Sequence, residues 1–426
     1  MLLYIDPGTG SMLFSILIGL AMTSLFAIRA LIIKIKTIIS FGKRAEIDKS
    51  NLGIVIYSDS KRYWNVFRPI AEEFKRRNLP LVYYTQSKDD PALSEKYGHV
   101  KAEFIGEGNR AFAKLNFLNA DICLSTTPGL DVLQWKRSKN CKWYVHIPHS
   151  LDEMMGYRMF GLDYYDAVLL TGDFQGGYIR RLEKMRNLPQ KELVTVGYPP
   201  MDEQKNRLDS LQNDTVTERS RSDETTILVA PSWGKGAILS KFGSEFLSAV
   251  QKTGFKIIVR PHPQTVTSEK EMLDALMKEF PESERFKWNF DNDNFACMNE
   301  ASLLITDFSG IIFDFALLFD KPLIYADTEF DSGIYDAAWF KDEKLWRFKI
   351  LEKIGLPLKT EDFANMKTVI ENALRDTSLK AGRDAARNEA WMYRGESAKR
   401  IADYLIEKQL SLSGKPRQSE KGGKND

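Results

Sequence analysis

Two histidines and an arginine come directly after runs of apolar residues, where their side chains could take part in chemistry. His149 follows one such run in "KWYVHIPHS", and Arg260 and His262 follow another in "FKIIVRPHP". A histidine can remove the proton of a hydroxyl group near neutral pH, and an arginine beside a histidine can bind a phosphate. We therefore predict His149 and His262 as catalytic residues and Arg260 as a phosphate-binding residue. His146, which lies inside the first run, is the alternative base.

The polar segment "TDFSG" interrupts two apolar runs, "LLI" before it and "IIFDFALLF" after it. This order predicts a strand, a loop at its carboxyl end and a helix. Small residues at a helix start leave backbone N–H groups free to bind an anion, and the helix dipole adds to the attraction. We predict that Thr306, Asp307, Ser309 and Gly310 bind a phosphate-containing ligand, with Asp314 accepting from one of its hydroxyl groups. The alternative is an ordinary helix start capped by Asp307 or Ser309.

The loop after His149 carries further polar residues. Ser150 is small and polar, and Asp152 and Glu153 are the next candidates for the base if neither histidine acts. A zinc site would need a third converging ligand, and the sequence offers no cluster of histidines that could supply it. Neither a GxxxxGK[ST] phosphate loop nor a DxD metal-binding motif is present. We therefore expect no metal and no other cofactor.

Short apolar runs alternate with helical patterns along the chain, which predicts parallel sheets with helices on both faces. In a first block we expect strands at 52–58, 79–85, 120–127, 142–150, 166–172 and 191–199, and an amphipathic helix at 62–78. In a second block we expect strands at 226–232, 255–263, 298–307 and 321–327, and a helix at 244–254. Ligands bind such sheets at the carboxyl ends of the strands, where the residues named above stand.

This alternation predicts an α/β protein with two Rossmann-like, doubly wound domains and a cleft between them. We place the first domain at 47–202 and the second at 227–408. Residues 203–226 are polar and nearly free of large apolar residues, as in a linker or the solvated end of a helix. The segments outside these domains are a membrane anchor with its basic flank (1–46) and a disordered basic tail (409–426).

The N-terminal segment has the composition of a membrane anchor. Residues 7–28 carry no charge, and residues 12–28 are strongly apolar. A membrane-spanning helix needs about 20 such residues. Five basic residues and no acidic one follow between 29 and 44, so the positive-inside rule predicts a single-pass anchor with the body of the protein in the cytoplasm. The alternative is an amphipathic helix docked on that body.

Bulk composition excludes some classes of protein. With 426 residues, of which 43% are apolar, the chain can form two or three globular domains. A net charge of +2 argues against a nucleic-acid-binding protein, which concentrates positive charge on one face. The three cysteines are far apart and show no metal-binding spacing, so we expect buried thiols in a reducing compartment.

Five segments taken together resemble a known family. "HIPHS", "GYPPMD", "VAPSWGKG", "RPHP" and "TDFSG" are similar, in this order, to motifs of the CDP-glycerol:poly(glycerophosphate) glycerophosphotransferase family of teichoic-acid polymerases and primases. The resemblance runs from about residue 142 to residue 405. It aligns His149 with the histidine of the first motif, and Ser232 and Trp233 with a Thr-Trp pair. The sequence departs from the motifs at Pro200, where the family has arginine, and at Gly310, where it has serine.

The resemblance implies a membrane-attached GT-B-type transferase. Such an enzyme moves a polyol-phosphate unit from a CDP-activated donor, such as CDP-glycerol, to a hydroxyl of a lipid-linked acceptor and releases CMP. In teichoic-acid or related cell-envelope polysaccharide synthesis, its partners would be the donor, the acceptor and membrane lipids, with no nucleic acid. The donor-binding residues would be Ser150, Ser232, Trp233, Arg260, Thr306, Asp307, Ser309, Gly310 and Asp314. The alternatives are a GT-B glycosyltransferase that uses a nucleotide sugar and a catalytically inactive, membrane-tethered relative.

Overall fold

The computed structural model describes residues 24, 28, 50–95, 98–214, 224–291, 293–326 and 332–414. The chain divides into two compact units, Met1–Asn51 and Leu52–Asp426, and the second unit carries both β-sheets. The expected membrane anchor falls in the first unit, almost entirely outside the described residues. Across the described ranges, no helix is long and apolar enough to span a bilayer.

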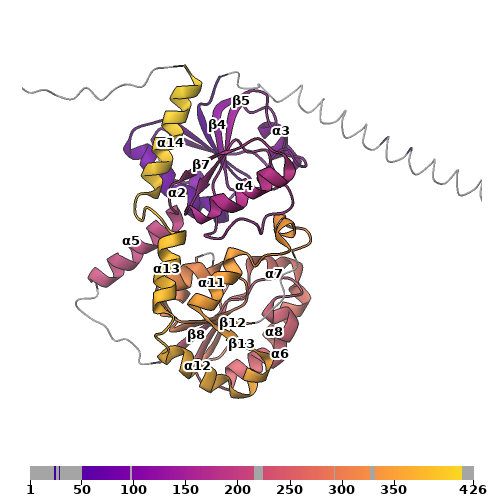
Figure 1. The fold of residues 1–426 in the computed structure, drawn as a ribbon, viewed down its shortest axis with the longest axis vertical. Helices are drawn as coiled ribbons and strands as arrows, with labels where there is room; N and C mark the ends of the chain where they lie inside the picture. Colours follow the sequence, from indigo (N-terminus) through magenta and orange to yellow (C-terminus); the bar gives the residue numbers. More distant parts are fainter. Residues whose placement is uncertain are drawn as a thin grey trace, which may run out of the picture. The chain divides into compact units, whose positions relative to one another are not determined.

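A parallel sheet of seven strands forms the first half of the larger unit (Figure 1). Its strands are β1 (Ile54–Ser58), β2 (Leu81–Thr85), β3 (Val100–Phe104), β4 (Ala120–Ser125), β5 (Cys141–His146), β6 (Ala167–Leu170) and β7 (Glu192–Thr195). They lie in the order β3-β2-β1-β4-β5-β6-β7. The order reverses between β1 and β4, and ligands of doubly wound sheets bind at such a switch point.

The strands that the sequence predicts in this half are all present. β3 is absent from the prediction because its sequence, "VKAEF", mixes charged with apolar residues, and none of its side chains is fully buried. The helical elements are η1 (Lys61–Tyr63), α2 (Trp64–Arg76), η2 (Pro91–Leu93), α3 (Asn109–Leu115), α4 (Phe174–Arg186) and α5 (Pro199–Asp214). α2 buries Phe67, Ile70 and Phe74, which recur at the spacing of one helix face.

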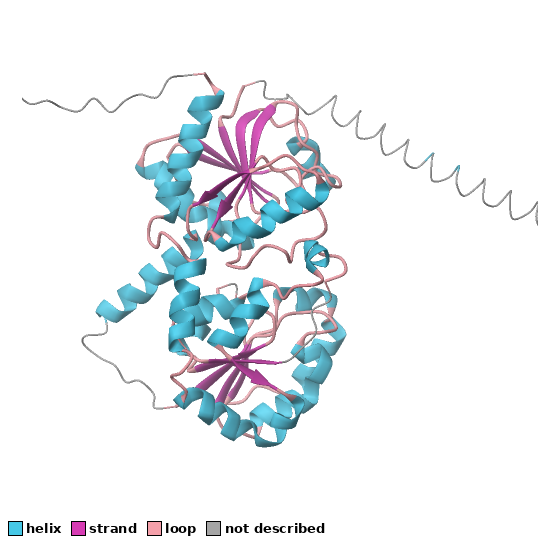
Figure 2. Cartoon of the chain, viewed as in Figure 1, coloured by secondary structure: helices cyan, strands magenta, loops and turns pink. Residues whose placement is uncertain are grey.

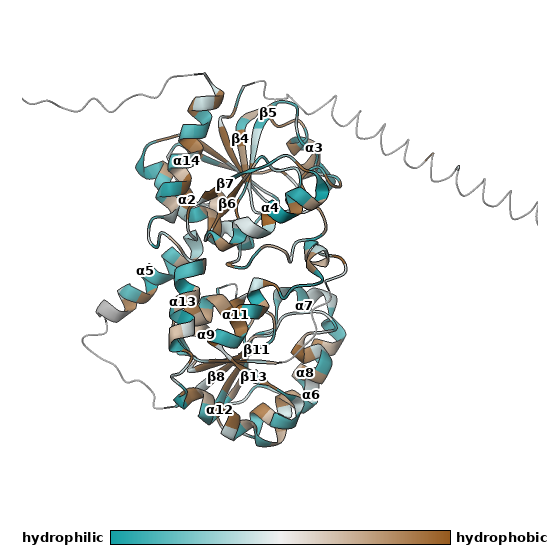
Figure 3. Ribbon diagram, viewed as in Figure 1, coloured by the Kyte–Doolittle hydropathy of each residue, from teal (hydrophilic) through white to brown (hydrophobic). Residues whose placement is uncertain are grey.

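A second parallel sheet, of six strands, forms the other half. Its strands are β8 (Thr226–Val229), β9 (Lys256–Val259), β10 (Phe286–Trp288), β11 (Leu303–Thr306), β12 (Leu323–Ala326) and β13 (Leu356–Leu358). They lie in the order β10-β9-β8-β11-β12-β13, so this sheet has its switch point between β8 and β11. The central strands β8 and β11 are fully buried and appear brown in Figure 3. The two strands that the sequence does not predict, β10 and β13, have only three residues each.

Helices cover both faces of each sheet (Figure 2). In the second half they are α6 (Ile238–Gln251), α7 (Pro263–Ser268), α8 (Lys270–Glu279), α9 (Phe295–Glu300), α10 (Ile311–Phe313), the π-helical turn η3 (Asp314–Leu318), η4 (Asp336–Phe340), α11 (Trp346–Ile354), η5 (Thr360–Asn365), α12 (Met366–Arg375) and α13 (Lys380–Ala390). This is the doubly wound α/β architecture that the alternating sequence predicts.

The expected linker is wrong for residues 203–214, which form the solvated helix end that was the alternative. Residues 203–214 continue α5, because most of them are good helix formers, and Lys205 and Asp209 form an ion pair one turn apart at 2.6 Å. A solvated helix and a linker can have the same polar composition, so composition did not distinguish them. Residues 215–223, which would complete the expected linker, lie outside the described residues.

The expected C-terminal boundary of the second domain is also wrong. The last helix, α14 (Ser397–Leu412), packs on the first sheet, where Ile401 and Leu405 are fully buried in the same core as Ile54 of β1. The helix also continues beyond residue 409, where we expected the tail to begin. Residues 415–426 of that tail lie outside the described part of the chain.

Asp202 contacts the chain where it returns to the first half. Its carboxylate accepts from the indole N–H of Trp391 at 2.7 Å and from the backbone N–H of Ser397 at 3.1 Å. Asp202 lies in the first turn of α5, and the two donors lie at the end of α13 and the start of α14. The carboxylate therefore holds the connection between the two helices against the first half.

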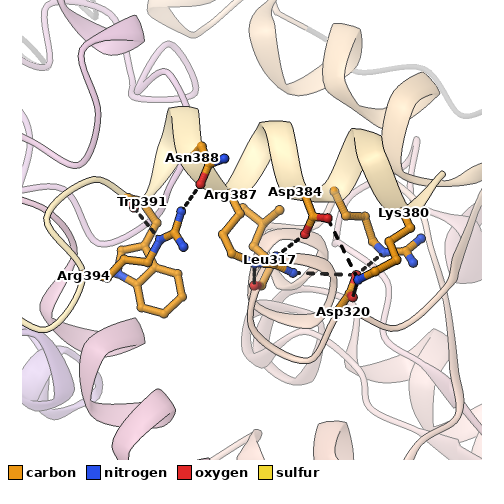
Figure 4. Close-up of polar contacts among 9 residues, drawn as sticks. Leu317, Asp320, Lys380, Asp384, Arg387, Asn388, Trp391 and Arg394 are labelled. Carbon is orange, nitrogen blue, oxygen red and sulfur yellow. Dashed lines mark hydrogen bonds and ion pairs between the residues drawn. The ribbon is translucent and has the colours of Figure 1, made fainter.

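An ion-pair network attaches α13 to the end of η3 (Figure 4). Asp320, whose φ angle is +52°, accepts from Nε of Arg383 at 2.8 Å and also pairs with Lys380. Burial alone would raise the pKa of Asp320, but hydrogen bonds from Lys380 and Arg383 hold it below its ordinary value. Arg387 donates to a carbonyl of η3. The network thereby supports the helical segment that begins with Asp314, a predicted site residue.

Candidate active site

The predicted site residues lie on loops at the two switch points and on the strands beside them. In the first half, η1 follows β1, and the loop that carries His149 follows β5, the neighbour of β4. In the second half, Ser232 follows β8, His262 follows β9 and Ser309 follows β11. Because all strands of each sheet are parallel, these loops emerge at the same edge of their sheet.

His149 lies between two tyrosine rings. Its ring centroid is 4.9 Å from that of Tyr63 and 5.8 Å from that of Tyr157. The hydroxyl of Tyr198 donates to the His149 carbonyl oxygen at 2.7 Å. The ring atom Nδ1 of His149 is buried and has no hydrogen-bond partner among the described residues. A buried polar atom of this kind calls for water or a ligand.

The surroundings of His149 favour its neutral form. Burial lowers its pKa below the ordinary value; the Asp152 carboxylate opposes this effect, and the Arg62 guanidinium adds to it. The imidazole is therefore uncharged at pH 7 and able to accept a proton.

His146 is fully buried at the end of β5. Its Nε2 lies 3.0 Å from the hydroxyl of Tyr157, and its ring also packs against Tyr165. Burial, and then the nearby His149, hold the pKa of His146 well below its ordinary value. Nδ1 of His146, like that of His149, is buried without a hydrogen-bond partner among the described residues, and His149 is the more exposed of the two histidines.

Asp152 and Glu153 are both bound by Arg347 of α11. Nη2 of Arg347 lies 2.9 Å from Oδ2 of Asp152, and its Nε donates to Oε1 of Glu153 at 2.8 Å. Burial raises the pKa of Glu153. For Asp152, burial also acts to raise the pKa, but the Arg347 charge together with hydrogen bonds from Met154 and Ser150 lowers it below the ordinary value. Ser150 also donates to Oδ2 of Asp152 at 2.8 Å. Both carboxylates therefore hold the two halves together and are poorly placed to replace a histidine as base.

Thr306 and Asp307, which we predicted to bind the ligand, have side chains that are bonded to the protein itself. Both are buried, and the Thr306 hydroxyl donates to the carbonyl of Ala230 at 2.7 Å. The Asp307 carboxylate accepts from the backbone N–H groups of Ser232 at 2.8 Å and Ile238 at 3.0 Å. The two side chains thus hold the loop after β8 in place. Neither Asp307 nor Ser309 caps α10 with its side chain.

His262 begins α7 and has a defined proton position. Its Nδ1 accepts from the backbone N–H of Gln264 at 3.1 Å, so the proton of the neutral ring is on Nε2. Burial lowers the pKa of His262 to about 4, and the Arg62 charge contributes to this shift. Trp233 stacks over the imidazole with 6.4 Å between ring centroids and is 38% exposed. The ring can therefore donate from Nε2 to an anion.

Arg260 is attached to the loop between β10 and α9. Its Nη2 donates to the carbonyl of Asp291 at 2.7 Å, and its Nη1 donates to the side chain of Asn289. The guanidinium has five N–H groups, so these contacts leave donors for a phosphate. Arg260 remains only partly buried.

The halves approach each other at Ser150 and Gly310. A β-carbon built on Gly310 would lie 3.5 Å from Oγ of Ser150. Ser309 beside it is 8% exposed, and Gly310 is exposed, at the start of α10. The φ angle of Gly310 is −62°, an ordinary helical value that any residue can adopt. The loop of His149 therefore faces the helix start that the sequence predicts as an anion site.

Asp314 stands one turn further into this helix. Burial raises its pKa to about 7, and a hydrogen bond from Asn294 opposes the shift. Burial, and then the negative charge of Asp314, raise the pKa of Tyr198, the residue bonded to the His149 carbonyl.

Sequence reasoning missed the residues that surround His149. Tyr198 stands in a motif quoted above but carries no predicted role, and Tyr63 and Tyr157 stand in segments without a motif. The only sequence signal for a role of Tyr63 was its position a few residues after a buried strand. Arg62 shares that position and acts electrostatically on both His149 and His262.

Solved structures with a similar fold were found, but none of the curated proteins matches the chain. A structure of the Wall Teichoic Acid Polymerase TagF has 16% sequence identity and a TM-score of 0.58, covering 92% of this chain and 98% of its own. A TagF variant soaked with CDPG has 15% identity and a TM-score of 0.56, covering 93% and 99%. A putative UDP-N-acetylglucosamine 2-epimerase from Listeria monocytogenes has 12% identity and a TM-score of 0.53, covering 87% and 99%. These likenesses establish the two-sheet parallel α/β fold, similar to GT-B enzymes.

A family model described as CDP-Glycerol:Poly(glycerophosphate) glycerophosphotransferase matches residues 175–406, more than half of the chain. The match includes His262, Ser309 and Asp314 but begins after His149. The family match therefore supports the site residues that lie on the second sheet, whereas the assignment of His149 to the site rests on geometry. The chain belongs to the CDP-glycerol:poly(glycerophosphate) glycerophosphotransferase family and is a CDP-glycerol glycerophosphotransferase-like enzyme.

Proposed function

We propose that this protein transfers a glycerol-phosphate unit, or another polyol-phosphate unit, from a CDP-activated donor to a hydroxyl of a lipid-linked cell-surface polymer or glycan. The observation that carries the proposal is the approach of Ser150, beside His149, to Gly310 at the predicted anion site. Family membership supports the CDP-glycerol donor, as does the solved TagF structure obtained with CDPG.

His149 acts as the general base in this proposal. The acceptor hydroxyl attacks the phosphorus atom that carries the glycerol, and its proton passes to the imidazole of His149. A new bond forms between the acceptor oxygen and phosphorus, while the bond from phosphorus to the bridging oxygen breaks and CMP leaves. The lowered pKa of His149 supports this role, because the ring is neutral before the reaction.

His262, Arg260 and the start of α10 bind the diphosphate. Nε2–H of His262 donates to a phosphate oxygen, and its Nδ1 is already occupied by the N–H of Gln264. Arg260 supplies positive charge, and Ser309 and Gly310 supply a hydroxyl and backbone N–H groups. The donor set thus stabilises the negative charge that develops on the leaving CMP.

The remaining predicted residues orient the donor or support the loops. Ser232 and Trp233 lie on the loop that Asp307 holds in place, and Trp233 offers an exposed ring face to a nucleoside. Asp314 accepts from a hydroxyl of the donor. We assign Thr306 and Asp307 to positioning this loop, since their polar atoms are satisfied inside the protein.

The test of the proposed function is turnover of a panel of activated donors. The full-length protein is incubated with CDP-glycerol, CDP-ribitol and UDP-sugars in the presence of a lipid-linked acceptor, and released CMP or UDP is measured. We expect CMP from a CDP-polyol and no UDP. Release of UDP alone would favour a glycosyltransferase that uses a nucleotide sugar. Absence of any release would favour a catalytically inactive relative.

We propose that residues 1–44 attach the enzyme to the cytoplasmic face of the membrane, as their apolar run and basic flank suggest. A variant that begins at residue 45 should remain in the soluble fraction of a lysate, while the full chain sediments with membranes. Both proteins should release CMP from the same donor. Sedimentation of the truncated protein after a high-salt wash would contradict this attachment.

A further inference from the structure

Arg62 lies on a firmly held turn beside the switch point of the first sheet. Ser60 caps η1, and its Oγ accepts from Nε of Arg62 at 3.2 Å. On one side, Lys61 pairs with Asp89; on the other, Tyr63 packs against the ring of His149. The turn is thus anchored on both sides, while the Arg62 side chain itself is exposed.

The contacts of Arg62 differ from those of two arginines in and directly after the neighbouring helix α2. Arg68 pairs with Glu203, and Arg77 pairs with Asp403 at 2.6 Å. Among the described residues, by contrast, no carboxylate lies within ion-pair distance of Arg62, and Ser60 is its hydrogen-bond partner. The nearby Asp59 feels the Arg62 charge, which partly offsets the rise in its pKa caused by burial. The guanidinium therefore keeps most of its donors for another partner.

The guanidinium of Arg62 lies over the ring of Tyr63, 5.6 Å from its centroid, and that ring packs against His149. The charged groups that act on His149 are Asp152 and Arg62, and those that act on His262 are Arg62 and Glu269. Arg62 thus acts on both imidazoles. In both histidines the positive charge of Arg62 disfavours protonation of the imidazole, so it helps to keep both rings neutral.

We propose that Arg62 is a further catalytic residue, whose guanidinium binds the phosphoryl group beside His149 during its transfer. This inference rests on the proposed function. It adds a residue from the β1–α2 connection, which lies outside the part of the chain that matches the family. The ligand class is a diphosphate ester.

The chemistry of the transfer explains what Arg62 would do. As the acceptor oxygen bonds to phosphorus and the bridging oxygen leaves with CMP, negative charge builds up on the non-bridging oxygens and on the leaving phosphate. A planar guanidinium can donate two parallel hydrogen bonds to such oxygens. Arg260 is partly occupied by Asn289 and Asp291, so Arg62 complements it from the opposite half of the protein.

The first test compares Arg62→Gln with Arg76→Gln, a matched loss of one arginine at the far end of α2, where Arg76 pairs with Glu73 at 2.6 Å. We expect Arg62→Gln to lower kcat for CMP release by about a hundredfold, the usual effect of removing one donor to a transition state. KM for CDP-glycerol should rise much less. Arg62→Lys should recover part of the loss, and Arg76→Gln should behave like the parent.

The second test needs no turnover. The histidine ring signals are followed by NMR as a function of pH in the substrate-free protein, and are assigned from their loss in His149→Gln and His262→Gln. Arg62→Gln should raise the apparent pKa of both histidines, and Arg76→Gln should leave both unchanged. A loss of turnover that Arg62→Lys does not recover, with unmoved titrations, would show a merely structural role and overturn the proposal.

The two proposals fail in different ways. Equal kcat in the parent and Arg62→Gln overturns the role of Arg62 and leaves the proposed function intact. If the parent releases no CMP from any CDP-polyol, the proposed function fails. The affinity of the variants for CDP then tests whether Arg62 contacts a diphosphate. Weaker binding of CDP to Arg62→Gln than to Arg76→Gln supports the diphosphate contact, whereas equal binding overturns it.

Discussion

The hydroxyl of Tyr198 donates a hydrogen bond of 2.7 Å to the backbone carbonyl of His149. The two residues follow strands β7 and β5, which are separated by β6 in the sheet. Tyr198 is 5% exposed, so this bond forms away from bulk water. The bond restrains the backbone of the proposed base, and the sequence around His149 does not predict it.

Removing the Tyr198 hydroxyl should loosen this restraint. We expect Tyr198→Phe to lower the free energy of unfolding by about 1–3 kcal/mol, because a buried carbonyl loses its partner. Turnover should fall more than donor affinity, since the position of the base changes and the donor loops do not. Tyr164→Phe, at a ring that is 46% exposed, is the control. Urea unfolding and CMP release measure the two effects, and parent-like turnover in Tyr198→Phe would contradict the restraint.

Replacing His149 should affect the chemical step. His149→Ala should lower kcat by about a hundredfold or more, while the affinity for the donor changes little. His146→Ala should mainly reduce stability, because that ring is fully buried against Tyr157. Should His146→Ala instead lose turnover while His149→Ala keeps it, the base is His146.

The pH dependence of kcat gives a separate check on His149. A general base works in its neutral form, so the rate should fall as the pH drops through the pKa of the folded protein. Burial lowers the pKa of His149, so the fall should begin below about pH 6.5, the ordinary histidine value. A decline that is complete above that pH would point to a different titrating group.

Breaking the ion pair of Arg347 should destabilise the protein. Arg347→Met leaves Glu153, which is fully buried, without its charged partner. We expect a loss of about 3–5 kcal/mol in the free energy of unfolding. Adding Glu153→Gln should recover part of the loss, because it removes the uncompensated charge. A single variant as stable as the parent in urea unfolding would show that the pair contributes nothing.

His262 should make stability depend on pH. Its pKa is about 4 in the folded protein and about 6.5 when unfolded, so the unfolded chain binds the proton between these values. Its contribution to stability is therefore present above about pH 6.5 and is lost as the pH falls toward about 4. His262→Asn keeps an acceptor at the start of α7 but does not titrate there. The loss of unfolding free energy between pH 7 and pH 5 should be smaller in this variant than in the parent.

Adding a side chain should change stability little at Gly310 and should destabilise the protein at Gly172. Gly310→Ser meets only Oγ of Ser150 at 3.5 Å, so we expect a change in unfolding free energy of about 0.5 kcal/mol or less and full turnover. A β-carbon on Gly172 would lie 2.0 Å from the carbonyl oxygen of Glu389. Gly172→Ala should therefore displace α13 from the end of β6 and lower the unfolding temperature. Calorimetry on both variants tests this contrast.

The loops of the candidate site could be predicted from sequence because polar residues after buried apolar runs stand out at short range. "RPHP" and "TDFSG" each follow a strand, and the structure brings His262 and Ser309 to the same edge of the second sheet. The strands were predictable for the same reason, except for β3, β10 and β13. Those three are short or only partly apolar, so local pattern alone does not distinguish them from loops.

The sequence by itself determined the two doubly wound sheets, the order of the site loops and the residue types available for chemistry. Tertiary structure alone decided the partner of each side chain. Asp307 binds the loop after β8, and Arg347 binds Glu153 across 194 positions of sequence. Where α14 returns to the first sheet, its first residue, Ser397, likewise bonds to Asp202, 195 positions earlier. Such contacts leave no periodic signal, because each joins two segments that are adjacent only after the chain has folded.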